Sequence, residues 1–336
     1  MSWIQKLYET YENCRSMIGV GSDDNEVPLL PICHTTQKAQ IEITIDQEGN
    51  FIRARVVPKE EARTIVPCTE TSGGRTGSKP ETHPLCDKLQ YIAGDFLDYG
   101  GEVTSGYAKN PREPHERYKE ILRKWCESEY SHPKAKAVLK HIEKGNVIKD
   151  LVDHQILCVG TDGRLLKKWD NKTDEDIPEI FKVLSNSDQA DAFVRWIVEI
   201  PNNPQAAVWN DSSLFESWIR YYSANKDDSA LCYVTGTELP AADQHPAKLR
   251  NDGDKAKLIS SNDTSGFTFR GRFSTAGQAC GVGFEVTQKA HNALRWLISR
   301  QGYKRGDQAI VAWAVSGKEI PDPMTDSFSI LGMDVM

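Results

Sequence analysis

The chain has 336 residues, of which 39% are hydrophobic and 26% charged, and its formal net charge is −7. This length allows one large domain or two ordinary ones, with enough apolar residues for a packed core. No apolar run approaches the roughly 20 residues of a membrane helix, and the N-terminus lacks the basic start and apolar stretch of a signal peptide, so we expect a cytoplasmic protein.

The N-terminal part predicts a helix and then a β-hairpin. Apolar side chains at Ile4, Leu7, Tyr8 and Tyr11 have helical spacing, so a helix is expected over residues 3–11. In AQIEITIDQEGNFIRARVV, residues 39–57, alternating apolar residues flank a turn that contains Gly and Asn, which is typical of a hairpin. The polar segment 69–84 has no apolar periodicity and is expected to be a long loop, either functional or disordered.

Further helices and strands follow without a regular βαβ spacing, which indicates a mixed α+β fold. Helices are expected at residues 113–127, 133–144, 212–222 and 289–300. Strands are expected at residues 155–159, 192–200, 231–234 and 308–315, the last largely buried. Gly, Pro and Asp accumulate at residues 235–255, so we expect residues 1–240 to form an N-terminal α+β region and residues 241–336 a second portion of the same large domain.

The long loop contains a Gly-rich stretch, Ser72-Gly73-Gly74-Arg75-Thr76-Gly77-Ser78-Lys79. It is not a nucleotide-hydrolysing P-loop, because Ser78 follows Gly77 and Pro80 follows the lysine. Glycines allow the backbone to approach a partner closely, while Ser, Thr, Arg and Lys supply donors of different reach. Such a loop suits entry into a DNA groove, and the alternative is a flexible surface loop.

Basic residues gather in two segments despite the acidic total. Residues 245–305 hold eleven Lys and Arg against four Asp and Glu, and residues 109–149 hold eleven against six, whereas residues 153–228 hold eight against fourteen. In the first segment, phenylalanines alternate with Arg270 and Arg272, which suits base stacking with phosphate contacts or an ordinary strand with a buried Phe face. His291, Arg295 and Arg300 are expected on the polar face of the 289–300 helix, either solvated or bound to phosphate.

The sequence offers no catalytic or metal-binding motif. None of the eight cysteines forms a C-x-x-C pair, no histidines form H-x-x-x-H, and no G-x-S-x-G is present. We therefore expect mostly buried free thiols, no cofactor, no metal and no catalytic residue, and hence no enzyme. Convergent carboxylates of a two-metal nuclease leave no sequence signature, so a stand-alone metal-dependent nuclease stays an alternative.

Three ordered stretches resemble the large subunit of the type I-C CRISPR Cascade surveillance complex, of the Dvulg subtype family. They are residues 75–95, where the Gly/Ser loop precedes PLCDKLQYIAGD; residues 231–248, LCYVTGTELPAADQHPAK; and residues 289–314, KAHNALRWLISRQGYKRGDQAIVAWA. With the N-terminal helix and hairpin in matching order, the resemblance spans most of the chain. Family members continue into a helical C-terminal region, which is absent from this sequence after Met336.

The resemblance implies a subunit that reads the protospacer-adjacent motif in double-stranded DNA and assists pairing of the guide RNA with its target in antiviral defence. Its implied partners are the guide 5′-end-binding subunit, the backbone subunits, the small subunit and a recruited helicase-nuclease. The Gly-rich loop, residues 72–79, is expected to contact the motif duplex, with Arg270, Arg272, Lys289 and Arg295 on the DNA backbone. A protein-only scaffold, which would use the acidic residues 153–228, is a further alternative.

Overall fold

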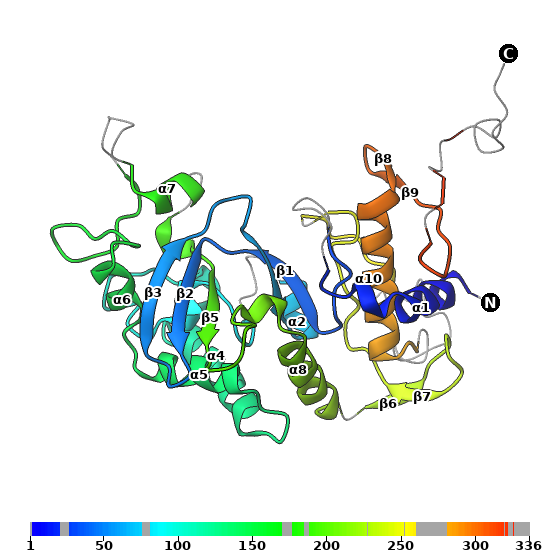
Figure 1. Ribbon diagram of the computed structural model, residues 1–336, viewed down its shortest axis with the longest axis horizontal. Helices are drawn as coiled ribbons and strands as arrows, with labels where there is room; N and C mark the ends of the chain where they lie inside the picture. The colour runs from blue at the N-terminus through cyan, green and yellow to red at the C-terminus, as the bar shows by residue number, and fades with distance from the viewer. Residues whose placement is uncertain are drawn as a thin grey trace, which may run out of the picture. The chain divides into compact units, whose positions relative to one another are not determined.

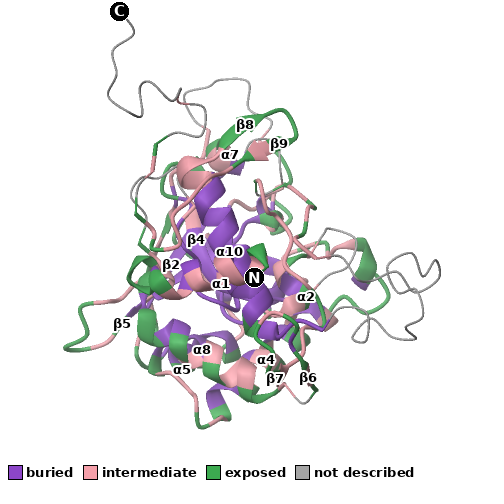
Figure 2. Cartoon of the chain, turned by 90° about the vertical axis from the view of Figure 1, so that its right-hand side faces the viewer, coloured by how far each residue is buried: buried purple, intermediate pink, exposed green. Residues whose placement is uncertain are grey.

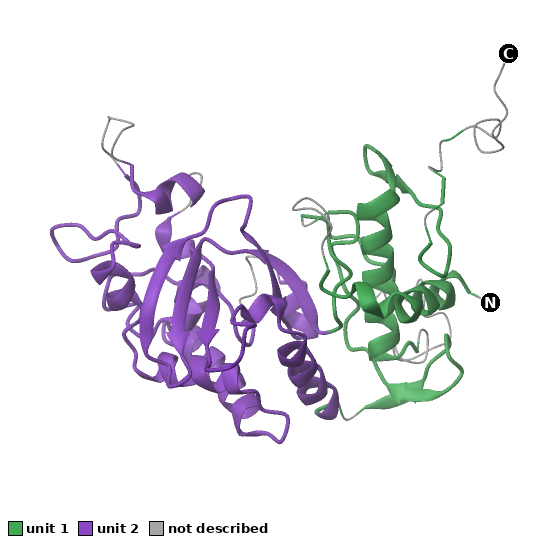
Figure 3. Ribbon diagram, viewed as in Figure 1, with its two compact units in different colours: residues 1–32, 225–336 green, residues 33–224 purple. Residues whose placement is uncertain are grey.

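The computed structural model describes residues 2–20, 27–75, 81–169, 177–184, 188–226, 228–251, 253–259, 281–318, 320–321 and 325 (Figure 1). The chain forms two compact units. Unit 1 is discontinuous and combines residues 1–32 with residues 225–336, and unit 2 is residues 33–224 (Figure 3). These limits differ from the expected division at residue 240, because the N-terminal helix packs on a helix that lies beyond that point in the sequence.

Helices and small sheets are interspersed throughout, so the mixed α+β class is confirmed. Unit 2 contains β1 His34–Lys38, β2 Ile41–Asp46, β3 Phe51–Val56, β4 Arg63–Pro67, α2 Glu70–Gly73, α3 Leu89–Ile92, α4 Glu113–Glu127, α5 Pro133–Glu143, α6 Val147–Asp153, α7 Glu179–Leu184, β5 Val194–Glu199 and α8 Ser212–Ala224. Unit 1 contains α1 Trp3–Asn13, β6 Ser229–Leu231, β7 Glu238–Pro240, α10 Phe284–Gln301, β8 Tyr303–Arg305 and β9 Gln308–Ile310.

The main sheet of unit 2 has the strand order β3-β2-β5. The predicted hairpin is confirmed, with β2 and β3 antiparallel, while β5 adds to β2 in parallel and pairs Trp196 with Ile43. Central strand β2 is buried almost throughout, since its alternating isoleucines enter the apolar core. The hairpin turn needs a glycine at position 49, where φ is 74° and an added Cβ would lie 2.7 Å from the Ala137 carbonyl oxygen.

The other face of this sheet carries a charge cluster centred on the buried Glu42. Glu42 accepts hydrogen bonds from Arg195 at 2.7 Å and from Arg55 at 2.6 Å, and the Arg195 guanidinium lies 3.9 Å from the Trp209 ring centre. Burial acts to raise the pKa of Glu42, but the hydrogen bonds and charges of the two arginines lower it overall. The carboxylate thus stays ionised although it is buried, and it ties β2 to both of its neighbours.

Helices complete the core of unit 2, and three predicted helices are confirmed as α4, α5 and α8. Trp125 of α4 and Trp218 of α8 are fully buried and pack edge to face with ring centres 5.1 Å apart. Lys134 of α5 is buried and forms an ion pair of 2.5 Å with Asp211, whose other carboxylate oxygen accepts the backbone N–H of Ser213 in the first turn of α8.

Unit 1 is built on α1 and α10, both predicted from sequence. Every residue of α10 from Phe284 to Ile298 is buried except Glu285. Chain segments close around the helix, and Asn292 donates to the Leu30 carbonyl at 3.1 Å. The solvated polar face expected for this helix is therefore absent.

Three predicted strands are corrected by the structure. Residues 155–159 turn back on the end of α6, where Ile156 and Leu157 both donate to the Leu151 carbonyl, and only Val159 forms an isolated bridge. Residues 308–315 form a strand only as far as Ile310, because the Ala312 carbonyl then accepts a side-chain hydrogen bond from Gln301. The expected strand at 231–234 is shifted and ends at Leu231. No helix in the described ranges is both long and apolar enough to cross a membrane.

Candidate nucleic-acid interface

The Gly-rich segment begins in a short helix, since Ser72 and Gly73 are the last residues of α2, so the loop expectation is corrected there. Thr69 caps α2, with its side chain accepting the Ser72 N–H at 3.0 Å, and the Ser72 hydroxyl accepts the Thr69 N–H at 2.9 Å. Ser72 is buried, and Gly73 lies close to Cys68, whose sulfur would be 3.2 Å from an added Cβ. Gly74 ends the helix and has open space on its Cβ side.

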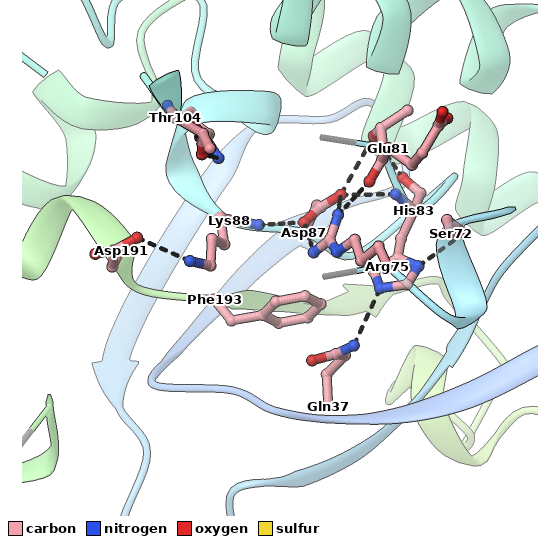
Figure 4. A network of polar contacts seen from close by, with 12 residues as sticks. Gln37, Ser72, Arg75, Glu81, His83, Asp87, Lys88, Thr104, Asp191 and Phe193 are labelled. Carbon is pink, nitrogen blue, oxygen red and sulfur yellow. Dashed lines mark hydrogen bonds and ion pairs between the residues drawn. The ribbon is translucent and has the colours of Figure 1, made fainter. Parts of the chain in front are cut away.

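Arg75 forms a bidentate ion pair with Asp87 (Figure 4). Its Nη2 lies 2.5 Å from Oδ1, and its Nη1 lies 2.8 Å from Oδ2. The same Nη1 donates to the Glu81 carbonyl at 2.5 Å, so one guanidinium joins the residues on the two sides of segment 76–80. The Arg75 side chain is 13% exposed and that of Asp87 0% exposed.

Asp87 is the centre of this network. Besides Arg75, its carboxylate accepts the backbone N–H groups of His83 at 2.6 Å and Lys88 at 2.7 Å, and the Thr82 hydroxyl at 3.3 Å. A fully buried carboxylate needs hydrogen-bond donors for its oxygens. Residues 81–88 are therefore folded around the Asp87 carboxylate, which fixes the conformation of the chain just after segment 76–80.

The imidazole of His83 connects the network to α2 and β1. Its Nε2 lies 3.1 Å from the Gln37 side-chain nitrogen, which is a donor, and its Nδ1 lies 3.1 Å from the Ser72 hydroxyl. With the Gln37 amide so oriented, Nε2 accepts and Nδ1–H donates to Ser72. In this tautomer the imidazole of His83 thus links Ser72, at the beginning of the Gly-rich segment, to the chain that follows segment 76–80.

Aromatic rings line the other side of the guanidinium. The Arg75 Cζ lies 5.2 Å from the Tyr91 ring centre, and Tyr91 meets Tyr107 edge to face. Burial raises the pKa of Tyr91 well above its ordinary value. Burial also acts to lower the pKa of Arg75, but the charge and hydrogen bonds of Asp87 raise it overall. Arg75 therefore stays charged and is occupied within unit 2, which does not fit its expected role as a direct DNA contact.

The other predicted contacts divide into two groups. The first group lies outside the described residues and consists of Thr76, Gly77, Ser78, Lys79, Arg270 and Arg272. Lys289 and Arg295 are on α10, where both are buried. Lys289 forms ion pairs with Glu12 at 3.0 Å and Glu285 at 2.9 Å, so its charge is used inside unit 1.

Burial of α10 also changes His291, which was expected on a polar face. Burial, together with the nearby charge of Arg295, lowers the pKa of His291 to about 3. Because a helix enclosed on all sides presents no phosphate-binding surface, Lys289 and Arg295 do not fit the expected backbone contacts. Among the described residues the structure brings together only Ser72, Gly73, Gly74 and Arg75 of the predicted contacts.

Sequence reasoning missed Asp87, His83 and Gln37, which organise the site. A partial signal was present in PLCDKLQY, where Asp87 directly follows the apolar residues Leu85 and Cys86. A carboxylate that is buried beside such residues needs a partner, although the sequence does not identify Arg75 as that partner. In the described part of the chain, no three His, Cys, Asp or Glu residues are grouped so that they could hold a metal ion.

Comparison with known proteins identifies a family. No curated protein matches the sequence. The family described as CRISPR-associated protein (Cas_Csd1) matches residues 7–333, which is nearly the whole chain. The chain therefore belongs to the Cas_Csd1 family of CRISPR-associated proteins.

Proposed function

We propose that this chain is the DNA-recognising large subunit of a type I-C CRISPR effector complex. It reads a short protospacer-adjacent motif in double-stranded DNA and assists pairing of the guide RNA with the target strand. Membership of the Cas_Csd1 family supports a role in a CRISPR complex. The structural observation that carries the proposal is the Arg75–Asp87 network, which joins the described residues on the two sides of segment 76–80.

This network favours recognition because a reading loop has to present its donors in one geometry. Two short backbone segments, residues 72–75 and 81–88, are joined by the guanidinium of Arg75 and by the imidazole of His83. Fixing the ends of a segment lowers the conformational entropy that it loses on binding. Arg75 is thus a positioning residue, and direct contacts are assigned to the segment Thr76–Lys79.

In this proposal the chain has no catalytic centre, and a recruited helicase-nuclease cleaves the DNA strands. It works with the guide RNA and with the other subunits of the complex. A stand-alone nuclease would instead cleave DNA or RNA as a purified protein with Mg²⁺ or Mn²⁺, and a chelator would stop the reaction. A protein-only scaffold would support assembly without salt-dependent binding of DNA.

The test is DNA capture by a guide-RNA complex reconstituted with this chain. Guide-matched duplexes with a randomised flank are selected for binding, and the selected flank is compared with an unselected one at several salt concentrations. Replacement of Thr76–Lys79 by alanines should abolish the preference for the selected flank while the complex still assembles. Lys124→Gln, which removes an exposed charge on α4, is the matched control and should retain the preference. Absence of any flank preference in the complex with the original chain would refute the proposal.

A further inference from the structure

The β8–β9 hairpin, residues 303–310, projects from the end of the most buried helix in unit 1. Helix α10 ends at Gln301, and Gly302 turns the chain directly into β8. Only glycine fits at this position, because an added Cβ would lie 2.6 Å from the Ile298 carbonyl oxygen. A two-residue turn, Gly306-Asp307, joins the strands, with φ of 57° at the glycine as primed hairpin turns require. The hairpin is called the basic ribbon below.

Strand alternation gives the basic ribbon two different faces. Tyr303 pairs with Ile310 and Arg305 pairs with Gln308, so these four side chains share one face. Lys304 pairs with Ala309 on the other face, where the lysine Nζ donates to the Arg250 carbonyl at 3.3 Å. The first face thus presents an aromatic ring, an aliphatic side chain, a guanidinium and an amide in a compact group.

This face is open to solvent. Tyr303 is 38% exposed and Ile310 is 41% exposed, although they form a cross-strand apolar pair. Arg305 is exposed and has no ion pair within the described ranges. Figure 2 shows the contrast between the purple α10 and the green β8. An exposed ring and an aliphatic side chain beside an exposed guanidinium leave this face available to a partner.

The charge of the basic ribbon indicates a polyanion. Arg300, Lys304 and Arg305 lie within one short stretch that contains a single acidic residue, Asp307. That carboxylate is fully exposed and lies 3.7 Å from the Arg250 guanidinium, which also forms a closer ion pair with Asp254 at 2.8 Å. Cationic side chains beside an exposed ring are the combination with which proteins bind single strands of nucleic acid.

We propose that the first face of the basic ribbon binds single-stranded nucleic acid. Tyr303 stacks on a base, Ile310 flanks it, and Arg305 pairs with an adjacent phosphate. Tyr303 and Arg305 are about 6.6 Å apart along the strand, so one nucleotide can contact both. A duplex fits less well, because its base faces are covered by neighbouring bases. The inference rests on the proposed function, in which opening of the target duplex releases a single strand.

The test measures binding of fluorescein-labelled oligothymidine to the full 336-residue chain by fluorescence anisotropy at several salt concentrations. Tyr303→Leu should raise the Kd about 5- to 100-fold because it removes stacking, and Tyr303→Phe should keep near-original affinity. Arg305→Gln should raise the Kd several-fold and reduce the slope of log K against log salt by about 0.7. Lys304→Gln, which removes the same charge from the opposite face, is the matched control and should change the Kd less than about twofold.

Three results would overturn the inference: no oligothymidine binding by the original chain, unchanged binding by Tyr303→Leu, or equal losses for Lys304→Gln and Arg305→Gln. Failure of the proposed function gives a different pattern. The Thr76–Lys79 replacement should keep oligothymidine binding while its complex loses flank preference. If oligothymidine binding depends on the ribbon but the complex shows no flank preference, the proposed function falls and the ribbon site stands.

Discussion

Replacement of Asp87 by alanine should destabilise unit 2 by about 3–5 kcal/mol, the cost of leaving a buried charge without its partner. Asp87 is fully buried, and its carboxylate accepts hydrogen bonds from Arg75, Thr82, His83 and Lys88. Alanine removes all of these at once and leaves the Arg75 guanidinium, only 13% exposed, beside a cavity. Water cannot fully replace the lost acceptor at such a site, so the cost exceeds that of a surface ion pair.

The free energy of unfolding is measured by urea denaturation, with hydrogen exchange of peptides from residues 81–92 reporting on unit 2. Combining Arg75→Met with Asp87→Leu removes both charges and should restore part of the lost stability, since no charge then remains unpaired. Glu120→Gln removes an exposed carboxylate of the same unit and should leave the midpoint unchanged. A loss below about 1 kcal/mol for Asp87→Ala, or a double variant less stable than the single one, would refute this account of the network.

Three further predictions concern the core of unit 2. Gly49→Ala should cost about 2–4 kcal/mol, because φ is 74° and the new Cβ would lie 2.7 Å from the Ala137 carbonyl oxygen; an unchanged melting temperature would contradict this. Lys134→Met should cost about 3–5 kcal/mol by leaving Asp211 buried and unpaired, and a matching loss should follow in urea denaturation. Burial lowers the pKa of His141 from 6.5 to about 4, so folded protein binds fewer protons than unfolded protein between these values. The contribution of His141 to stability should be full above pH 6.5 and fall by up to roughly 3 kcal/mol toward pH 4. His141→Gln should remove this part of the pH dependence, and an unchanged dependence would contradict the assignment.

Elements with strong local periodicity could be predicted from the sequence. The β2–β3 hairpin follows from alternating residues around a Gly-containing turn, and α10 follows from apolar residues at helical spacing. The parallel pairing of β5 with β2 could not be predicted, because it joins strands separated by about 150 residues and depends on core packing. Segment 155–159 is apolar enough for a strand, yet its backbone donors are taken by the end of α6.

The candidate site was only partly predictable for the same reason. Composition singled out the Gly-rich stretch, and in the structure its described half, residues 72–75, forms one cluster with residues 81–88. Composition could not show that Arg75 faces inward, since this depends on Asp87, twelve residues away. The periodicity of α10 likewise suggested a polar face, but it does not reveal that neighbouring segments enclose the whole helix.

The discontinuity of unit 1 has a consequence for biosynthesis. Helix α1 leaves the ribosome before unit 2, whereas α10, on which it packs, follows about 270 residues later. At about 5–20 residues per second, this delay is roughly 15–50 s, during which unit 2 is completed and can fold. The apolar side of α1 is therefore exposed to solvent or chaperones throughout that interval. Closing unit 1 also brings together two chain segments across a long intervening segment. The entropic cost of closing a loop grows only slowly with its length, and folding of unit 2 into a compact body shortens the part of this loop that is still flexible.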